Sequence, residues 1–317
     1  MDQLARSAMI AVRDCMGAKA GESVLVITDD AKKDIGEAIY EAARQMGCDP
    51  MLLVMPPRLR NGQEPPKAVA EAMKGADVVL CPTSRSLSHT DARHEACKNG
   101  ARIATLPGIT AECMARTLGA DYSLIKSRTE KLVEAFKGVK SVRITTAAGT
   151  DITMSVEGRT FGPDTGILTS KGDFGNLPAG EAYVAPIEGT SSGVVVVDGA
   201  MAGYGVASVP IVMEVKDGFA VKLSGPEDID RLNKLIDPLG MPARNIAELG
   251  IGTNDKAIIT GLVLEDEKVM GTIHVAIGDN SHFGGNVAVP SHLDGIVKSP
   301  TIWADGRQIM KDGKLLI

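Results

Sequence analysis

The sequence predicts two domains: an α/β domain with a parallel sheet over residues 1–137, and a β-rich, antiparallel, barrel-like domain over residues 138–317. The length of 317 residues favours two domains over one. Runs of β-branched residues alternate with amphipathic stretches in the first third. After Gly138 the chain changes to short runs rich in Gly, Val, Thr and Ile, separated by turn signals, which is typical of an antiparallel sheet or barrel.

The N-terminal part is expected to alternate helices and strands. We expect helices over Leu4–Met16, Ala31–Met46, Pro66–Lys74, Asp91–Asn99 and Glu112–Phe136, and strands over Ser23–Thr28, Met51–Met55, Ala76–Cys81 and Arg102–Leu106. Asp29 and Asp30 are placed to cap the second helix, which should stop at Gly47. This alternation predicts a parallel sheet with helices on both faces. Because no glycine-rich phosphate-binding motif follows the first strand, we interpret this domain as a scaffold.

The C-terminal part reads as a series of short strands. Two strands are expected around a turn at Ala148 and Gly149, followed by VVVVDG, IVMEVKDG, FAVKLSG and IITGLVLEDEKVMGTIHVAIG. The exception is Pro226–Leu239, which predicts a helix capped near Ser224 with acidic residues in its first turn.

Composition excludes several classes of protein. A net charge of −6 at pH 7 argues against a nucleic-acid-binding protein, and an aromatic content of 3% argues against base stacking. The five cysteines include no CxxC pair, which favours a reducing compartment over a disulfide framework. The N-terminus lacks the apolar core of a signal peptide, and no run is long enough to span a membrane. We therefore expect a soluble, cytoplasmic protein.

The segment Gly271–Asp294 is the strongest candidate for a functional site. It contains three of the five histidines, His274, His282 and His292, and ends in the pair His292 and Asp294. In an extended strand, residues two apart point to the same face, so this pair can reach one point. The pattern predicts a metal site built on strands and loops. A hairpin with scattered histidines is the alternative.

Two carboxylates lie in apolar surroundings elsewhere in the C-terminal domain. Glu181 follows a Pro-Ala-Gly turn, and Glu248 lies between apolar residues and is followed by glycines. A buried carboxylate needs a compensating partner, which a cation can supply. Together with His274, His292 and Asp294 they offer ligands for one or two ions of Zn, Co, Mn or Fe(II). The alternative is that both glutamates are surface residues at strand ends.

Four segments carry a resemblance to a known family. NLPAGEAYVAP, AELGIGTN, GTIHVAIG and SHLDG, in that order, resemble the landmark segments of the aminopeptidase T and aminopeptidase S family of metallopeptidases. The resemblance covers most of the C-terminal domain. It implies an α/β domain paired with a β-rich domain that holds a two-metal site, and a homodimer. The metal ligands that the resemblance implies match Glu181, Glu248, His274, His292 and Asp294.

The sequence also departs from the aminopeptidase pattern. The tyrosine that the family places about seven residues after the histidine of GTxH is missing, and Ser281 and His282 stand there instead. The chain is shorter than typical members, and the segment between His274 and His292 is compressed. The same superfamily includes the 2,5-dihydroxypyridine 5,6-dioxygenases, shorter proteins with one Fe(II) held by two His and one Asp. Their His-x-Asp pair would match His292 and Asp294.

These features predict a metal-dependent aminopeptidase-like hydrolase, which removes N-terminal residues through a metal-activated water. His282 would be catalytic, stabilising the oxyanion. The alternative is a mononuclear Fe(II) ring-cleaving dioxygenase that uses His292, Asp294 and either His274 or His282. A third interpretation is a binding protein without a metal. The expected partners are a small-molecule or peptide substrate and a second copy of the chain, with no nucleic acid and no membrane.

Overall fold

The computed structural model describes residues 2–317, and the chain divides into two compact units. The first unit comprises Met1–Lys126 and Thr165–Ala179, and the second comprises Ser127–Asp164 and Gly180–Ile317. The division therefore differs from the predicted one at residue 137. It falls inside a helix, and a later segment returns to the first unit.

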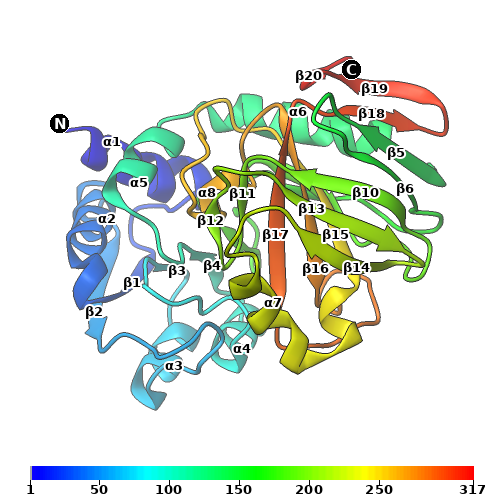
Figure 1. Cartoon of the computed structure of the whole chain (residues 1–317). Coiled ribbons are helices and arrows are strands. Elements are labelled where there is room, and N and C mark those ends of the chain that lie inside the picture. The colour runs from blue at the N-terminus through cyan, green and yellow to red at the C-terminus, as the bar shows by residue number, and fades with distance from the viewer. Residues whose placement is uncertain (1) are drawn as a thin grey trace. The chain divides into compact units, whose positions relative to one another are not determined.

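The first unit is built on a five-stranded sheet in the order β2-β1-β3-β4-β8, in which all neighbouring strands are parallel. Figure 1 labels β2, β1, β3 and β4 of this sheet. The strands are β1 (Ser23–Asp29), β2 (Asp49–Met55), β3 (Val78–Cys81), β4 (Arg102–Thr105) and β8 (Phe174–Asn176). The helices are α1 (Gln3–Ile10), which continues as a π-helical turn over Ala11–Cys15, then α2 (Lys33–Gln45), α3 (Lys67–Lys74), α4 (Asp91–Lys98) and α5 (Ala111–Thr117). The predicted parallel α/β architecture is confirmed.

The central strands β1, β3 and β4 of the first unit's sheet are buried on both faces, whereas the edge strand β2 is partly exposed. In β1, Leu25 and Ile27 belong to a core cluster that includes Val69 of α3, whereas Val24 and Val26 point to the opposite face and are also buried. A parallel strand covered on both faces reads as a continuous hydrophobic run, which explains the sequence SVLVIT.

Two predicted details of the first unit are wrong. Asp29 does not cap the second helix, because its carboxylate accepts hydrogen bonds from the backbone N–H (2.5 Å) and the hydroxyl (2.9 Å) of Ser84. The predicted helix Glu112–Phe136 is two helices, α5 and α6 (Tyr122–Ala135). Asp121 starts the second of them, since its carboxylate accepts hydrogen bonds from the backbone N–H and the hydroxyl of Ser123.

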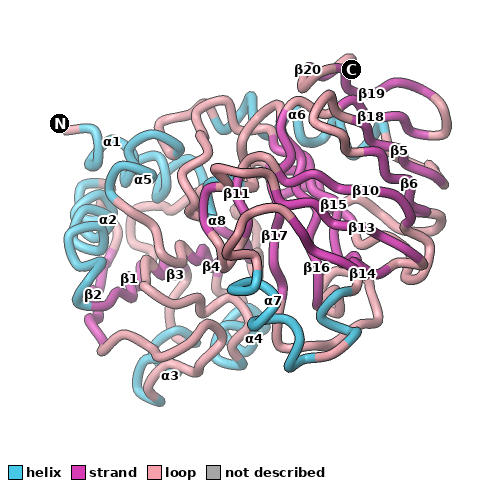
Figure 2. Tube along the Cα trace, in the orientation of Figure 1, coloured by secondary structure: helices cyan, strands magenta, loops and turns pink. Residues whose placement is uncertain are grey.

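The second unit consists mainly of strands (Figure 2), and they pair antiparallel. An eight-stranded sheet has the order β14-β13-β10-β6-β5-β18-β19-β20: β5 (Ser141–Thr145), β6 (Asp151–Ser155), β10 (Ser192–Val197), β13 (Ile211–Lys216), β14 (Phe219–Ser224), β18 (Thr301–Ala304), β19 (Arg307–Lys311) and β20 (Lys314–Leu315). A seven-stranded sheet has the order β12-β11-β17-β16-β15-β9-β7: β7 (Gly162–Asp164), β9 (Glu181–Val184), β11 (Ala200–Met201), β12 (Gly205–Val206), β15 (Ile246–Gly252), β16 (Thr272–Gly278) and β17 (His292–Lys298).

Both antiparallel sheets contribute to one hydrophobic core. Val142 and Ile152 of the eight-stranded sheet lie in the same buried cluster as Leu249 and Val275 of the seven-stranded sheet. The two strand orders are open at both ends, so the antiparallel architecture is confirmed but a barrel is not. Most of α6 belongs to this unit, where Thr129 and Thr253 are joined by a 2.8 Å hydroxyl hydrogen bond.

Apart from α6, the helical segments of the second unit are short. The predicted helix Pro226–Leu239 is reduced to α7 (Asp230–Ile236) and a 3-10 turn over Asp237–Leu239, and no side chain caps its N-terminus. Ser224, the predicted cap, ends β14 instead. A further helix, α8 (Val263–Asp266), precedes β16.

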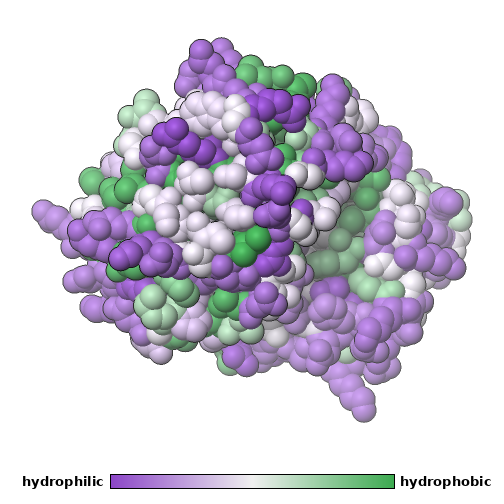
Figure 3. Space-filling view, turned by 90° about the vertical axis from the view of Figure 1, so that its right-hand side faces the viewer, coloured by the Kyte–Doolittle hydropathy of each residue, from purple (hydrophilic) through white to green (hydrophobic). Residues whose placement is uncertain are grey.

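The surface seen in Figure 3 is mostly hydrophilic, with hydrophobic residues scattered over it and also in a hollowed area at the right of the view. Scattered apolar residues on the surface are ordinary for a folded protein. None of the helices in the described part of the chain combines the length and hydrophobicity needed to cross a bilayer.

Candidate metal centre

One face of the seven-stranded sheet packs in the core, and the opposite face carries charged residues. In β15, Leu249 and Ile251 belong to the core cluster, so Glu248 points to the other face. In β16, Val275 belongs to the core, and His274 points away from it. The two-residue period of each strand thus separates the hydrophobic core from a polar site on the same sheet.

Cross-strand pairing places small residues beside the charged ones. The pairs on the polar face are Glu181 with Gly252, Gly250 with His274, Ala276 with both Glu248 and Asp294, and Gly278 with His292. A Cβ atom at position 250 would overlap the imidazole of His274. The glycine therefore lets this ring lie flat across the neighbouring strand, and the small residues leave room for a cluster of ligand-type side chains.

Glu248, His292 and Asp294 form the first group of this cluster. The Nε2 of His292 lies 3.1 Å from Glu248 Oε2 and 3.3 Å from Asp294 Oδ1. The other ring nitrogen, Nδ1, lies 2.7 Å from the backbone carbonyl of Asp279. Because a carbonyl oxygen can only accept, Nδ1 carries a hydrogen and donates it. This bond fixes the ring with Nε2 facing the two carboxylates.

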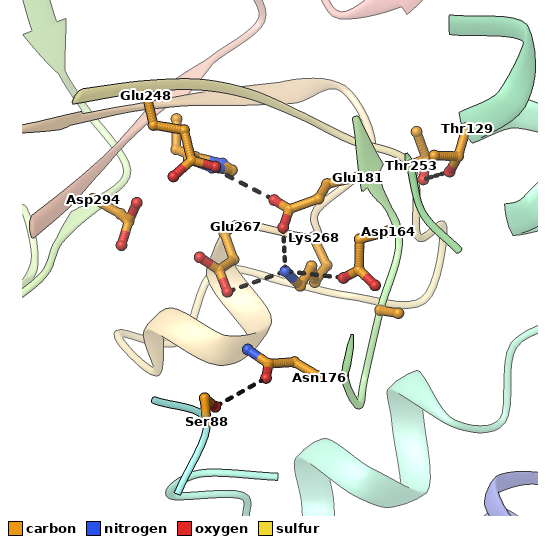
Figure 4. Close-up of polar contacts among 12 residues, drawn as sticks. Ser88, Thr129, Asp164, Asn176, Glu181, Glu248, Thr253, Glu267, Lys268 and Asp294 are labelled. Atoms are coloured by element: carbon orange, nitrogen blue, oxygen red, sulfur yellow. Dashed lines mark hydrogen bonds and ion pairs between the residues drawn. The ribbon is translucent and has the colours of Figure 1, made fainter. Parts of the chain in front are cut away.

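A buried lysine organises the second group. The Nζ of Lys268 lies 2.5 Å from Glu181 Oε1, 3.1 Å from Glu267 Oε1 and 3.3 Å from Asp164 Oδ2 (Figure 4). Its side chain is only 2% exposed, so this ammonium has three carboxylates in place of water. Asp164 and Glu181 are direct partners across the β7–β9 pair, which puts two like charges side by side.

His274 connects the two groups. Its Nε2 lies 3.4 Å from Glu181 Oε2 and 3.4 Å from Glu248 Oε1, and its side chain is 1% exposed. Among residues 2–317, two sets of ligand-type side chains bring one ligand atom from each residue within 4.8 Å of the others: Glu181, Glu267 and His274, and Glu248, His292 and Asp294.

The pKa values of the cluster reflect its excess of carboxylates. Burial lowers the pKa of a histidine, but the hydrogen bond to Glu248 and the surrounding carboxylates outweigh it and raise the pKa of His274 to about 9. The pKa of His292 is raised for the same reason. Burial raises the pKa of Glu181 to about 8, although Lys268 opposes this shift. Without another cation, the carboxylates hold protons on both imidazoles.

The cluster fits a divalent metal ion. Three of its buried polar atoms, Glu181 Oε2, His274 Nδ1 and Asp294 Oδ1, make no hydrogen bond. Unsatisfied buried polar atoms are costly and call for a missing partner. Imidazole nitrogens with carboxylate oxygens are ligands that suit Zn, Mn or Fe(II). Glu248, His292 and Asp294 would hold the ion, with His274 next to them.

One aromatic ring adjoins His292, and a second ring adjoins the first. The ring of Phe283 contacts the imidazole edge to face, with centroids 5.7 Å apart, and Tyr183 contacts Phe283 at 6.0 Å. Tyr183 lies on the polar face two residues after Glu181, and burial, with the nearby acids, raises its pKa to about 12. The loop that carries Phe283 is fixed at its base by Asn280, whose side chain donates a hydrogen bond to Glu188.

Comparison with known proteins identifies the family. Residues 8–317 match the family of 2,5-dihydroxypyridine 5,6-dioxygenases. The chain belongs to this family. A search of curated proteins found no match.

Two solved structures share the fold. The 2,5-dihydroxypyridine dioxygenase from Pseudomonas putida KT2440 is 19% identical with a TM-score of 0.85, over 100% of this chain and 98% of that chain. The protein AmpT from Thermus thermophilus is 16% identical with a TM-score of 0.73, over 99% of both chains. These two structures show the shared fold, and the family match supports an enzyme. The family match favours the dioxygenase alternative over the aminopeptidase interpretation.

The structure brings together all five residues predicted as metal ligands. Glu181, Glu248, His274, His292 and Asp294 lie on one face of one sheet, at the distances given above. Neither glutamate is a surface residue, since both are buried. His282, the predicted catalytic residue, lies in an exposed turn beside Phe283, and its catalytic role stays a prediction.

Of the second group, sequence reasoning found Glu181 but missed Lys268, Glu267 and Asp164. Lys268 and Glu267 occur in the run LEDEKVMG, which reads as a solvated turn, and Asp164 lies in a three-residue strand. Only Asp164 lies in a segment with a local signal: the Gly and Pro residues before it indicate a short extended segment. The ammonium meets its carboxylates through the pairing of β7 with β9, which no local pattern encodes.

Proposed function

We propose that the chain is a ring-cleaving dioxygenase that uses one Fe(II) to open a dihydroxylated aromatic ring with O2. The observation that carries this proposal is the group Glu248, His292 and Asp294, in a chain that matches the 2,5-dihydroxypyridine 5,6-dioxygenase family over residues 8–317. Non-haem Fe(II) oxygenases typically hold the ion with two histidines and one carboxylate. His292, Asp294 and the neighbouring His274 would supply that set, and Glu248 lies between the two imidazoles as a further carboxylate. A bound Fe(II) would supply the one-electron chemistry that lets O2 react with an aromatic ring.

The protein's own residues would hold and orient the reactants. The Asp279 carbonyl keeps the Nε2 of His292 facing the site. Glu248 lies between the two imidazoles, 3.4 Å from His274 and 3.1 Å from His292. Phe283 and Tyr183 offer edges and faces against which a planar ring can pack. The raised pKa of Tyr183 keeps its phenol protonated at neutral pH, so it can donate a hydrogen bond to a ring substituent.

A metal-dependent aminopeptidase is the second candidate. It is supported by the presence of two ligand groups side by side, as a two-ion hydrolase requires, and by the fold shared with AmpT. Against it, the ammonium of Lys268 stands in the second group, within 3.3 Å of three carboxylates. Under either function the proposed substrate is a small molecule or peptide, and the proposed assembly is a homodimer.

An oxygen electrode distinguishes the two functions. Protein loaded with Fe(II) under anaerobic conditions should consume O2 when 2,5-dihydroxypyridine is added, and the H292A variant should not. H89A, which alters an exposed histidine of the first unit, serves as the control and should keep full activity. The same protein loaded with Mn, Co or Zn should leave aminoacyl p-nitroanilides intact. Release of p-nitroaniline without O2 consumption would instead support the aminopeptidase.

A further inference from the structure

We infer that Lys268 acts as a built-in cation that occupies the place of a second metal ion, so that the chain binds one divalent ion and not two. This inference rests on the proposed function, because it assigns the single ion of that function to Glu248, His292 and Asp294. It also defines a latent metal site, made of Asp164, Glu181 and Glu267, that opens when the lysine is removed.

The surroundings of Lys268 are those of a metal ion more than those of an ordinary ion pair. Three carboxylate oxygens from β7, β9 and the end of α8 converge on its Nζ, at 3.3, 2.5 and 3.1 Å respectively. An ammonium has three hydrogens, which matches three acceptors. Among the largest fully buried side chains in the described part of the chain, Lys268 is the charged one and the others are apolar.

The three carboxylates around Lys268 need a cation beside them, whether an ammonium or a metal ion. Asp164 and Glu181 face each other across antiparallel strands, and like charges in that position repel. Glu181 is 8% exposed, and its second oxygen, Oε2, is buried without a hydrogen bond while lying 3.4 Å from the Nε2 of His274. Glu181, Glu267 and His274 also have their ligand atoms within 4.8 Å of one another, close enough for one ion.

The backbone holds the lysine in this place. The N–H of Lys268 donates to the carbonyl of Glu265 (3.0 Å), and its carbonyl accepts from the N–H of Asn254 (2.9 Å). The residue is thus fixed at both peptide groups between α8 and the β-bridge of Asn254 with Val269. The backbone is fixed by these bonds and the ammonium by its three carboxylates, so the lysine keeps the second group closed to metal.

The position of Lys268 limits the chemistry that the site can perform. Two ions a few ångströms apart can activate a shared water and polarise a carbonyl in hydrolysis. With a lysine in one position, the water-activating pair cannot form, and the remaining ion at Glu248, His292 and Asp294 works alone. Lys268 is therefore a positioning residue that sets the metal stoichiometry of this fold.

Two substitutions at one position test the inference. K268A removes the charge and leaves room for an ion with its water ligands. K268M also removes the charge but fills the space with an apolar chain. Carboxylate-rich sites suit Mn²⁺, so the bound Mn²⁺ is counted per chain by elemental analysis after dialysis against MnCl2, and thermal unfolding is followed with and without MnCl2. R102A, which removes a buried cation that pairs with Glu22 in the first unit, is the control for general destabilisation.

We expect one Mn²⁺ per chain in the wild type, two in K268A and one in K268M. The unfolding temperature of K268A should rise on addition of MnCl2 by more than that of the wild type, whereas K268M and R102A should rise no more than the wild type. Two ions in the wild type would overturn the inference, as would a folded K268A with one ion. If K268A folds neither alone nor with MnCl2, the predicted rescue has failed and the inference falls.

These outcomes are separable from those of the proposed function. The ion count and the unfolding temperature need no turnover. A wild type that binds one ion but consumes no O2 would refute the dioxygenase and leave the role of Lys268 standing. A wild type that consumes O2 but binds two ions would refute the role of Lys268 and leave the dioxygenase standing.

Discussion

Gly250 of β15 lies directly opposite His274 of β16, and the imidazole of His274 occupies the space where a side chain at position 250 would be. The φ of Gly250 is not in the left-handed region, so the backbone conformation does not require a glycine here. The missing Cβ is what the site requires, because it leaves space for the ring. The packing of one ring over one glycine thus sets where Nε2 of His274 meets Glu181 and Glu248.

Replacement of this glycine should therefore weaken the metal site. We expect G250A to displace the imidazole and to lower the affinity for Mn²⁺ by about 10–100-fold, the range found when a group that orients a ligand is lost. Isothermal titration with MnCl2 measures it. G75A is the matched control, because a Cβ at position 75 meets no atom closer than 3.8 Å. An unchanged affinity in folded G250A would contradict the proposed place of His274.

We expect Asp294 to be a ligand of the metal ion and the D294N variant to bind the ion poorly. Its Oδ1 is buried without a hydrogen bond, 3.3 Å from His292 Nε2. D294N keeps the size of the side chain and removes its charge, so we expect at least a tenfold loss of bound metal by elemental analysis. D217N alters an exposed aspartate with φ of 50°, a conformation that asparagine accepts well, and should bind metal normally. Equal metal content in both variants would remove Asp294 from the site.

Phe283 should contribute to binding of the aromatic substrate and not to binding of the metal. F283L loses the ring that contacts His292, whereas F283Y keeps it. An aromatic contact is worth about 0.5–1.5 kcal/mol, so KM for 2,5-dihydroxypyridine should rise about 2–10-fold in F283L. F283Y should stay near the wild-type value, and the metal content of both should be unchanged. A loss of metal in F283L would mean that the ring supports the ligands instead.

Much of this site follows from local patterns in the sequence, and the rest does not. The pair His292 and Asp294 lies on one face because β17 is extended, as the two-residue period requires. Glu181 and Glu248 were conspicuous because carboxylates seldom stand among apolar residues unless something compensates them. Lys268 could not be foreseen, since Asp164 and Glu181 come together by strand pairing and Glu181 lies 87 residues before the lysine in the chain.

The fold, like the site, was predictable from local patterns only in part. The parallel sheet was predicted as far as β4 because strands and helices alternate regularly. Its fifth strand, β8, comes from a segment 70 residues later and is three residues long, too short for a pattern. The antiparallel strands were recognised by their residues, but whether they form a barrel or separate sheets depends on non-local pairing that alternation cannot show.

Stability of the first unit should depend on pH through Glu22. Burial raises the pKa of this carboxyl, but hydrogen bonds from Arg102 (2.6 Å) and the backbone N–H of Lys19 (2.8 Å) outweigh it, so the pKa lies below its usual 4.5. A lowered pKa in the folded state means that the stabilisation is complete above pH 4.5 and is lost as pH falls through the folded value.

E22Q should accordingly be less stable than the wild type by about 1–2 kcal/mol at pH 7, the size of a charge-assisted hydrogen bond. The difference should shrink as the pH is lowered below 4.5, when Glu22 itself becomes neutral. Urea unfolding at several pH values measures both. A gap between the two proteins that grows toward acid would reverse the sign and refute this assignment.

The proposed activity is tested most directly by the origin of the oxygen atoms in the product. Protein loaded with Fe(II) is given 2,5-dihydroxypyridine under ¹⁸O2, and the product is examined by mass spectrometry. Ring cleavage by a dioxygenase should place both atoms of O2 in an opened-ring product, and D294N should form none. Label arriving from water, or an unopened ring in metal-loaded and folded protein, would contradict the assignment of Glu248, His292 and Asp294 to oxygen chemistry.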